Sequence, residues 1–242
     1  IVGGGTVKRT TTNHVDQTID VVAGKNKTLR EAYNELLISF NENYDLLVRA
    51  YDEGIAYRFI TRLDGEIIIN SEDAVFNFTS TPTIYFPECD TNYSGEKDQQ
   101  GKVHQIHQGY RNFERLYKTY NAPTDITNNR FSVSPVLFSY PDTPYKIVVT
   151  ESDTYDYPGL YMEQNGVNSM RGKWAQYPKE VMDSDPSNSS YWYSNHLVIS
   201  RENYIAKTEG SRTFPWRVII VSDDDKSLLN NELVYMLSLI HI

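Results

Sequence analysis

Residues 36–60 read LLISFNENYDLLVRAYDEGIAYRFI, and this stretch contains three apolar segments separated by two short polar connections. Leu36 to Phe40 and Tyr44 to Ala50 are rich in aliphatic and aromatic residues, as β-strands are. Asn41-Glu42-Asn43 between them has the length of a hairpin loop. The third segment, Ile55 to Ile60, follows a polar turn that ends in glycine. The stretch therefore predicts three consecutive antiparallel strands.

Similar segments recur along the chain, bounded by Gly, Pro, Asn and Asp, which is typical of half-buried antiparallel strands. We expect further strands at Glu66–Asn70, Ala74–Phe78, Thr83–Phe86, Phe131–Tyr140, Tyr145–Thr150 and His196–Ser200. Pro141-Asp142-Thr143-Pro144 predicts a turn between two of them. Their spacing favours an all-β antiparallel sandwich over alternating βαβ units.

The most apolar strand is expected at Phe214 to Val221. Ser222-Asp223-Asp224-Asp225 follows it and is typical of a helix N-cap with acidic residues in the first turn, which complement the helix dipole. A short helix through Leu228 and Leu229 is therefore predicted.

Composition limits the classes of function. The chain has 242 residues, 39% of them hydrophobic, which is enough apolar material for one large β domain. A formal charge of -9 repels phosphate backbones, so nucleic acid is a poor candidate partner. No apolar run approaches the roughly 20 residues that span a bilayer. Cys89 is the only cysteine, and we interpret it as an unreactive thiol.

The segment from Cys89 to Thr127 is polar and irregular, apart from a helix-compatible patch at Asn112 to Tyr120. Four aromatic residues in and beside that patch would share one helical face, which suits core packing better than a sugar-stacking platform. They are Tyr110, Phe113, Tyr117 and Tyr120. His104 and His107 form H-x-x-H, which binds zinc only on a helix with further ligands, and the flanking glycines oppose a helix.

Val149 to Gly159 reads VTESDTYDYPG and places three carboxylates and two tyrosines at a strand end and the turn beyond it. Calcium prefers six to eight oxygen ligands, some of which such a cluster can supply. The spacing matches no EF-hand loop, and composition alone favours a solvated acidic loop over a calcium site. Taken alone, the residues indicate an acidic β-sandwich with one loop of interest.

Several segments together resemble the N-terminal domain of glycoside hydrolase family 97, a Bacteroidetes-rich family of α-glucosidases and α-galactosidases. The resemblance runs from about Lys8 to Ser238. The segments that carry it are Tyr33–Leu36, Arg49–Phe59, Glu151–Gly159, Tyr204–Thr208 and Phe214–Ser222. Their order along the chain is harder to obtain by chance than any one of them.

The resemblance implies a three-part enzyme, with a galactose-mutarotase-like super-sandwich, a catalytic (β/α)8 barrel and a small C-terminal β domain. This chain corresponds to the super-sandwich, which we expect to be truncated at its N-terminus, and it carries no catalytic residue of its own. The implied partners are its own barrel and α-linked glucosides or galactosides, and the implied location is periplasmic or secreted. By motif position, Glu151 matches a family glutamate that helps to bind a calcium ion shared with the barrel.

Asp153, Asp156 and Tyr157 share the loop with Glu151, and we interpret them as loop-ordering or interface residues. Two alternatives to a supporting domain stay open. A free-standing mutarotase-like epimerase would use His104 or His107 with Glu151 as acid and base. A carbohydrate-binding module would use exposed aromatic residues, for which Tyr191, Trp192 and Tyr193 are the candidates.

The C-terminal residues Leu237 to Ile242 are apolar and lack a cap or a partner strand. CTGTCTCTTATACACATC, a transposon end, also encodes these six residues. We therefore expect the β-sandwich domain to occupy residues 1–236 and residues 237–242 to be a non-native tail.

Overall fold

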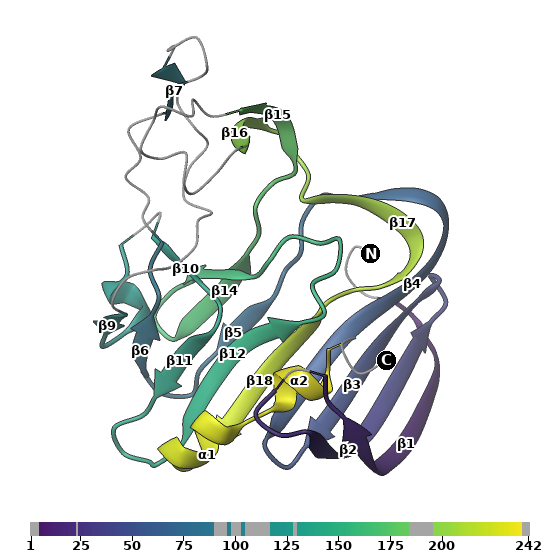
Figure 1. The fold of residues 1–242 in the computed structure, drawn as a ribbon, viewed down its shortest axis with the longest axis vertical. Coiled ribbons are helices and arrows are strands. Elements are labelled where there is room, and N and C mark those ends of the chain that lie inside the picture. The colour runs from purple at the N-terminus through teal and green to yellow at the C-terminus, as the bar shows by residue number, and fades with distance from the viewer. Residues whose placement is uncertain are drawn as a thin grey trace.

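The computed structural model of the chain describes residues 5–22, 24–89, 96–97, 103–104, 117–127, 130–183 and 196–238. Most regular structure within these residues is β-strand, and both α-helices follow the last strand (Figure 1). All described strand pairs are antiparallel. The predicted all-β antiparallel fold is confirmed.

The strands of the described residues are β1 (Val7–Asp20), β2 (Thr28–Phe40), β3 (Tyr44–Tyr51), β4 (Gly54–Ile69), β5 (Val75–Asn77), β6 (Thr83–Phe86), β7 (Glu96–Lys97), β8 (Val103–His104), β9 (Lys118–Tyr120), β10 (Phe131–Val133), β11 (Val136–Ser139), β12 (Lys146–Ser152), β13 (Tyr161–Gln164), β14 (Ser169–Lys173), β15 (Pro178–Asp183), β16 (His196–Arg201), β17 (Ala206–Thr213) and β18 (Trp216–Ser222). The helices are the 3-10 turn η1 (Pro123–Asp125), α1 (Asp225–Asn230) and α2 (Leu233–Met236).

Among the described strands the main sheet has ten members, in the order β1-β2-β3-β4-β18-β12-β11-β6-β9, and β17 pairs with β4 outside this path. A second sheet has the order β10-β13-β14-β5. Two further pairs, β15-β16 and β7-β8, stand apart from both sheets. The two larger sheets form the layers of the sandwich.

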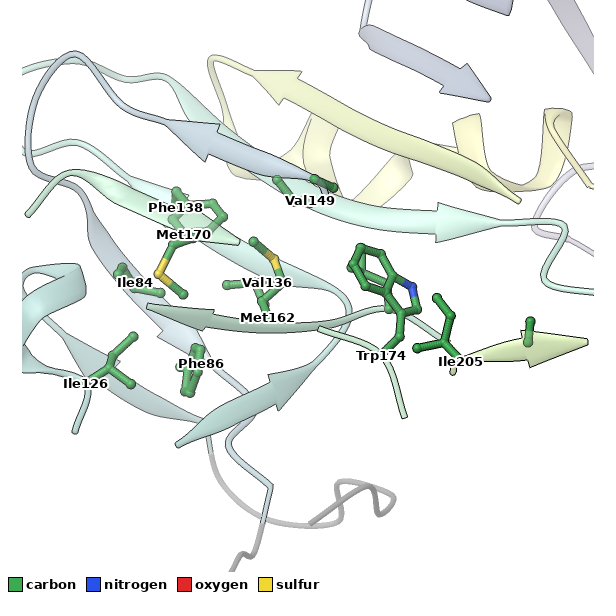
Figure 2. Close-up of a cluster of buried hydrophobic side chains, with 13 residues drawn as sticks. Ile84, Phe86, Ile126, Val136, Phe138, Val149, Met162, Met170, Trp174 and Ile205 are labelled. Atoms are coloured by element: carbon green, nitrogen blue, oxygen red, sulfur yellow. The ribbon is translucent and has the colours of Figure 1, made fainter. Parts of the chain in front are cut away.

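The first core lies between the four-stranded sheet and the β6, β11 and β12 part of the main sheet. Phe86 and Phe138 from the main sheet pack with Met162 and Met170 from the small sheet, and all four are fully buried (Figure 2). Trp174 lies at one side of this core, near Ile205 (Figure 2). Alternate residues of each strand enter the core, as the pleat requires.

The second core covers the opposite face of the main sheet. Trp216, Val218 and Ile220 of β18 pack there with residues of β2, β3 and β4, and α2 contributes Leu233 and Met236. Helices α1 and α2 contact β18 and β12, respectively, and cover part of this face (Figure 1). The sheet is therefore covered on both sides near its centre.

Strands β12 and β18 contribute to both cores. In β12, Val149 belongs to the first core and Val148 packs against the second. In β18, Val218 and Ile220 belong to the second core, whereas Ile219 between them packs against the first. A strand with both faces covered is apolar at successive positions. This explains why the three consecutive residues Val218, Ile219 and Ile220 of β18 are all apolar.

Several predictions from the sequence are confirmed. The hairpin at Asn41-Glu42-Asn43 joins β2 to β3. The expected strands at Thr83–Phe86 and Tyr145–Thr150 appear as β6 and β12. Asp224 is the N-cap of α1, and its side chain accepts a hydrogen bond from the Ser227 N–H at 2.9 Å.

Two expected strands differ from the structure. Phe131–Tyr140 is not one strand, because Pro135 interrupts it and lacks the N–H that a ladder needs; β10 and β11 then join different sheets. Glu66–Asn70 is not a separate strand but the end of β4, which continues through Gly65 at a φ of 67°. A positive φ favours glycine, so the turn signal at this position marks an irregularity within a long strand.

The prediction of a helix at Asn112–Tyr120 is wrong for its described residues, because Lys118–Tyr120 form β9 and pair with β6. Residues 112–116 lie outside the described residues, as do residues 184–194 of the expected loop at Asp183–Ser194. Leu237 is buried in the second core, and the proposed non-native origin of residues 237–242 stays a prediction. No helix among the described residues is long and apolar enough to cross a membrane.

Two neighbouring residues of β6 test the first core. Phe86 is fully buried, whereas Tyr85 is 38% exposed on the other face. Phe86→Ala should lower the free energy of unfolding by about 3–5 kcal/mol, measured by urea denaturation, because it leaves a cavity. Tyr85→Ala should cost less than about 1 kcal/mol. Equal losses in the two variants would contradict this assignment of the core.

Candidate functional site

Glu151 lies near the end of β12, at the position paired with Arg217 of β18. Its Oε1 accepts a hydrogen bond from the Leu160 N–H at 2.7 Å, and its Oε2 accepts one from Arg217 Nη1 at 2.7 Å. The side chain is 11% exposed. A Cβ at position 159 would lie 3.3 Å from Oε1, so Gly159 allows the loop to approach the carboxylate closely.

Arg217 connects Glu151 to a second carboxylate. Its Nε and Nη2 donate to the two oxygens of Glu72 at 2.7 and 2.6 Å, which is a bidentate pair, while Nη1 alone reaches Glu151. The Tyr157 hydroxyl also donates to Glu72 Oε2, at 3.1 Å. The Arg217 guanidinium lies 5.1 Å from the centre of the Trp174 ring, and its side chain is 2% exposed. We call Glu72, Arg217 and Glu151 the buried triad.

The triad combines two carboxylates with one guanidinium, so its formal charge is negative by one. Burial raises the pKa of Glu151, and the charge of Arg217 opposes that rise. Burial also disfavours the charged form of Arg217, but the hydrogen bonds and charges of the carboxylates raise its pKa above the ordinary value. Burial raises the pKa of the neighbouring Tyr57 to about 12, so that phenol stays neutral. The negative charge of the triad is therefore balanced only in part by its own members.

The loop that follows Glu151 is held by two other arginines. Arg58 Nη1 donates to Asp153 Oδ2 at 3.1 Å. Arg212 donates to the backbone carbonyls of Tyr155, at 2.9 Å, and Asp156, at 3.1 Å. Asp153 and Asp156 have φ values of 59° and 50°, a region that aspartate tolerates better than most residues. These contacts fix a loop whose Tyr155 is 80% exposed, in agreement with a loop-ordering role for Asp153 and Asp156.

Arg58 also belongs to a stack of cations and aromatic rings on the face of the second core. Its guanidinium lies 4.3 Å from the Trp216 ring centre, and that of Arg49 lies 5.1 Å from the same ring and 4.3 Å from Tyr33. Arginine stacks well on aromatic faces. Three of the sequence segments that carried the family resemblance therefore meet in this stack.

The donor set fits one contribution to a calcium site and not a complete site. Among the described residues no three His, Cys, Asp or Glu side chains converge as a metal site would require. An ionised carboxylate offers about four acceptor positions, and the hydrogen bonds from Leu160 and Arg217 use two at Glu151. Carboxylates that bind metals are usually held by such hydrogen bonds. Glu151 can therefore donate to a cation whose other ligands come from elsewhere.

The other candidates from the sequence do not join this site in the described residues. His104 is in β8, but its side chain, like all of His107, Tyr110 and Phe113, lies outside them. Tyr191, Trp192 and Tyr193 also lie outside. Tyr120 donates its hydroxyl to the buried Glu88 from β9, which is a packing role. Cys89 is buried.

A cavity of about 600 Å³ lies at the other end of β12, where Tyr145 precedes the strand. Asp52, Glu53, Asp223 and Glu232 contribute to its lining. Burial and the charge of Asp52 raise the pKa of Glu53. The cavity does not include Glu151, so the two acidic regions are separate.

Sequence reasoning missed Glu72, Arg58 and Arg212. Glu72 lies in the polar connection between β4 and β5, where a charged residue usually just faces water, so no local signal marks it. Arg217, like Arg58, was part of a recognised segment without an assigned role. The long sequence separation of these residues from the acidic loop explains the omission, since only the tertiary fold brings them together.

Comparison with known proteins decides the family. The model of the glycosyl-hydrolase 97 N-terminal family matches residues 2–239. The chain belongs to this family. A retaining alpha-galactosidase of Bacteroides thetaiotaomicron is 30% identical to this glycosyl-hydrolase 97 N-terminal domain over 229 residues. The alignment covers 94% of the chain and 32% of that relative, so the chain spans about a third of the relative's length.

Solved structures show the same fold. A glycoside hydrolase family 97 enzyme from Pseudoalteromonas sp. strain K8, in complex with acarbose, matches 95% of this chain and 29% of its own with a TM-score of 0.65 and 15% identity. A beta-arabinopyranosidase matches 90% of this chain and 32% of its own with a TM-score of 0.56 and 16% identity. The family 97 resemblance and the sandwich fold expected from the sequence are therefore confirmed.

Removing the central cation tests the triad. Arg217→Ala should lower the free energy of unfolding of the chain by about 3–5 kcal/mol in urea denaturation, because two buried carboxylates lose their partner. Arg171→Ala is the matched control, since Arg171 also pairs with a glutamate, Glu163, at 2.8 Å but is 52% exposed. Arg171→Ala should lower the free energy of unfolding by less than about 1 kcal/mol. Similar losses would show that the triad is not the buried network described above.

Proposed function

We propose that this domain supports the catalytic barrel of a glycoside hydrolase that acts on α-glucosides or α-galactosides, lines the sugar pocket and donates Glu151 to a calcium ion shared with the barrel. The observation that carries the proposal is the buried triad. It holds a carboxylate at a strand end, leaves acceptor positions on it unused, and keeps an excess of negative charge that a cation would balance.

The chemistry that such an ion supplies when bound is charge stabilisation and orientation of oxygen atoms at the sugar. The residues of this chain contribute in a different way. Arg217 and the Leu160 N–H hold the Glu151 carboxylate in one orientation, and the arginine-clamped loop keeps the strand end ordered. A site built on a strand and supported in this manner is positioned more accurately than one on a free loop.

The sugar class is inferred from relatives. One relative is named a retaining alpha-galactosidase, and one solved family 97 structure is a complex with panose. Pockets commonly form at domain interfaces, which supports a lining role for a loop beside Glu151. We also propose a periplasmic or secreted location for the parent protein, and this rests on the family resemblance.

The isolated chain should not hydrolyse p-nitrophenyl α-glucoside or α-galactoside, with or without added calcium. Glycosidic hydrolysis uses two carboxylates that face each other across the scissile bond, and we assign both to the barrel. Release of p-nitrophenol, followed by absorbance, checks this expectation. Turnover by the pure chain above that of a buffer control would overturn the supporting role, and mutarotation of fresh α-glucose, followed by polarimetry, would favour the epimerase alternative.

Glu151→Gln tests the ligand role in the complete enzyme formed by this chain and its barrel. The variant should raise the calcium Kd at least about tenfold in calorimetric titration, because an amide lacks the charge of a carboxylate ligand. Glu163→Gln is the matched control, since Glu163 also accepts hydrogen bonds from two cations, Arg171 and Lys173, but lies on β13. An unaltered Kd for Glu151→Gln would exclude Glu151 as a ligand.

A further inference from the structure

We infer that Glu72 is a positioning residue for Glu151, because it holds Arg217 in an orientation that leaves Glu151 available to a cation. The inference rests on the proposed function and deepens it. Glu72 lies in the connection between β4 and β5, far from the acidic loop in sequence, and it touches Glu151 only through Arg217.

The geometry of the guanidinium carries the inference. A guanidinium binds a carboxylate most strongly through two parallel N–H groups. In this structure Arg217 gives that fork, Nε and Nη2, to Glu72 and presents only Nη1 to Glu151. Glu151 therefore receives one N–H from Arg217, on Oε2, while Oε1 receives one from the Leu160 backbone.

Removal of the Glu72 charge would alter this division. A buried guanidinium needs a carboxylate partner, and without Glu72 the remaining partner of Arg217 in the triad is Glu151. Arg217 would then neutralise Glu151 and occupy acceptor positions that a cation needs. Glu72 thus competes with Glu151 for Arg217, and this competition leaves acceptor positions on Glu151 open to a cation.

A second contact fixes Glu72 itself. The Tyr157 hydroxyl donates to Glu72 Oε2 from the loop that follows Glu151. Tyr157 packs edge-on against Phe214 at a ring distance of 5.5 Å, so its position is set by the sandwich. The loop, the β4–β5 connection and β18 therefore meet at one carboxylate.

The test is calcium binding to the complete enzyme, measured by calorimetric titration after EDTA treatment. Glu72→Gln keeps the shape of the side chain and should raise the calcium Kd about 10- to 100-fold, as loss of a group that supports a metal ligand does. Tyr157→Phe should raise it by a smaller factor, about two- to fivefold, because Glu72 loses one hydrogen bond. Glu163→Gln should leave the Kd unchanged.

Stability and activity provide separate readouts. Activity of Glu72→Gln should be restored by a higher calcium concentration, with kcat at saturating calcium close to that of the parent enzyme. If Glu72 had only a structural role, Glu72→Gln would lower the urea midpoint measured in EDTA but leave the calcium Kd unchanged. That result would overturn the inference. If Glu72→Gln fails to fold, Tyr157→Phe decides, and an unchanged Kd in that variant also overturns it.

Glu151→Gln separates this inference from the proposed function. If Glu151→Gln weakens calcium binding but Glu72→Gln does not, the positioning role is wrong while the ligand role stands. If Glu151→Gln itself leaves the Kd unchanged, the ligand role fails and the positioning role fails with it.

Discussion

The antiparallel pairing of β12 with β18 is the constraint on which the rest of the structure depends. Its register places Glu151 opposite Arg217 and, on the same two strands, directs alternate apolar residues into two different cores. A shift by one residue would exchange the faces of every side chain on the strand. The apolar packing that fixes this register therefore also fixes the polar contact at the strand end.

The two cores stabilise the domain, whereas the triad sets the geometry of the polar groups at the strand end. Apolar burial is the main stabilising contribution in such a domain, and it comes here from Phe86, Phe138, Trp216 and their neighbours. The triad lies where that apolar cover ends, beside Trp174 and Tyr157. Low exposure there strengthens the interaction of Arg217 with both carboxylates, and it makes any unbalanced charge expensive.

The sequence predicts those parts of the fold in which one residue pattern serves one local role. The β2–β3 hairpin and the Asp224 cap are of this kind. Strand β1 was not predicted, because most of its residues are exposed on both faces and leave no periodic signal. In β17 the buried positions are the small residues Ala206, Thr208 and Gly210, so its burial alternates without an apolar pattern. The site follows the same rule: the motif identified Glu151, whereas Glu72 and Arg212 reach the loop only through tertiary contacts.

Stability alone does not explain a buried arginine between two glutamates. The desolvation of three charged groups offsets much of their attraction, and apolar residues of similar volume often stabilise a fold as well or better. The arrangement does provide a carboxylate with a fixed orientation and an incomplete charge balance, attached to a strand that both cores hold rigid. A donor on such a strand keeps its position when a neighbouring domain docks, whereas a donor on a free loop would first have to be ordered. The fixed orientation and the incomplete charge balance therefore both support the proposed role of Glu151 as an oxygen ligand at an interface.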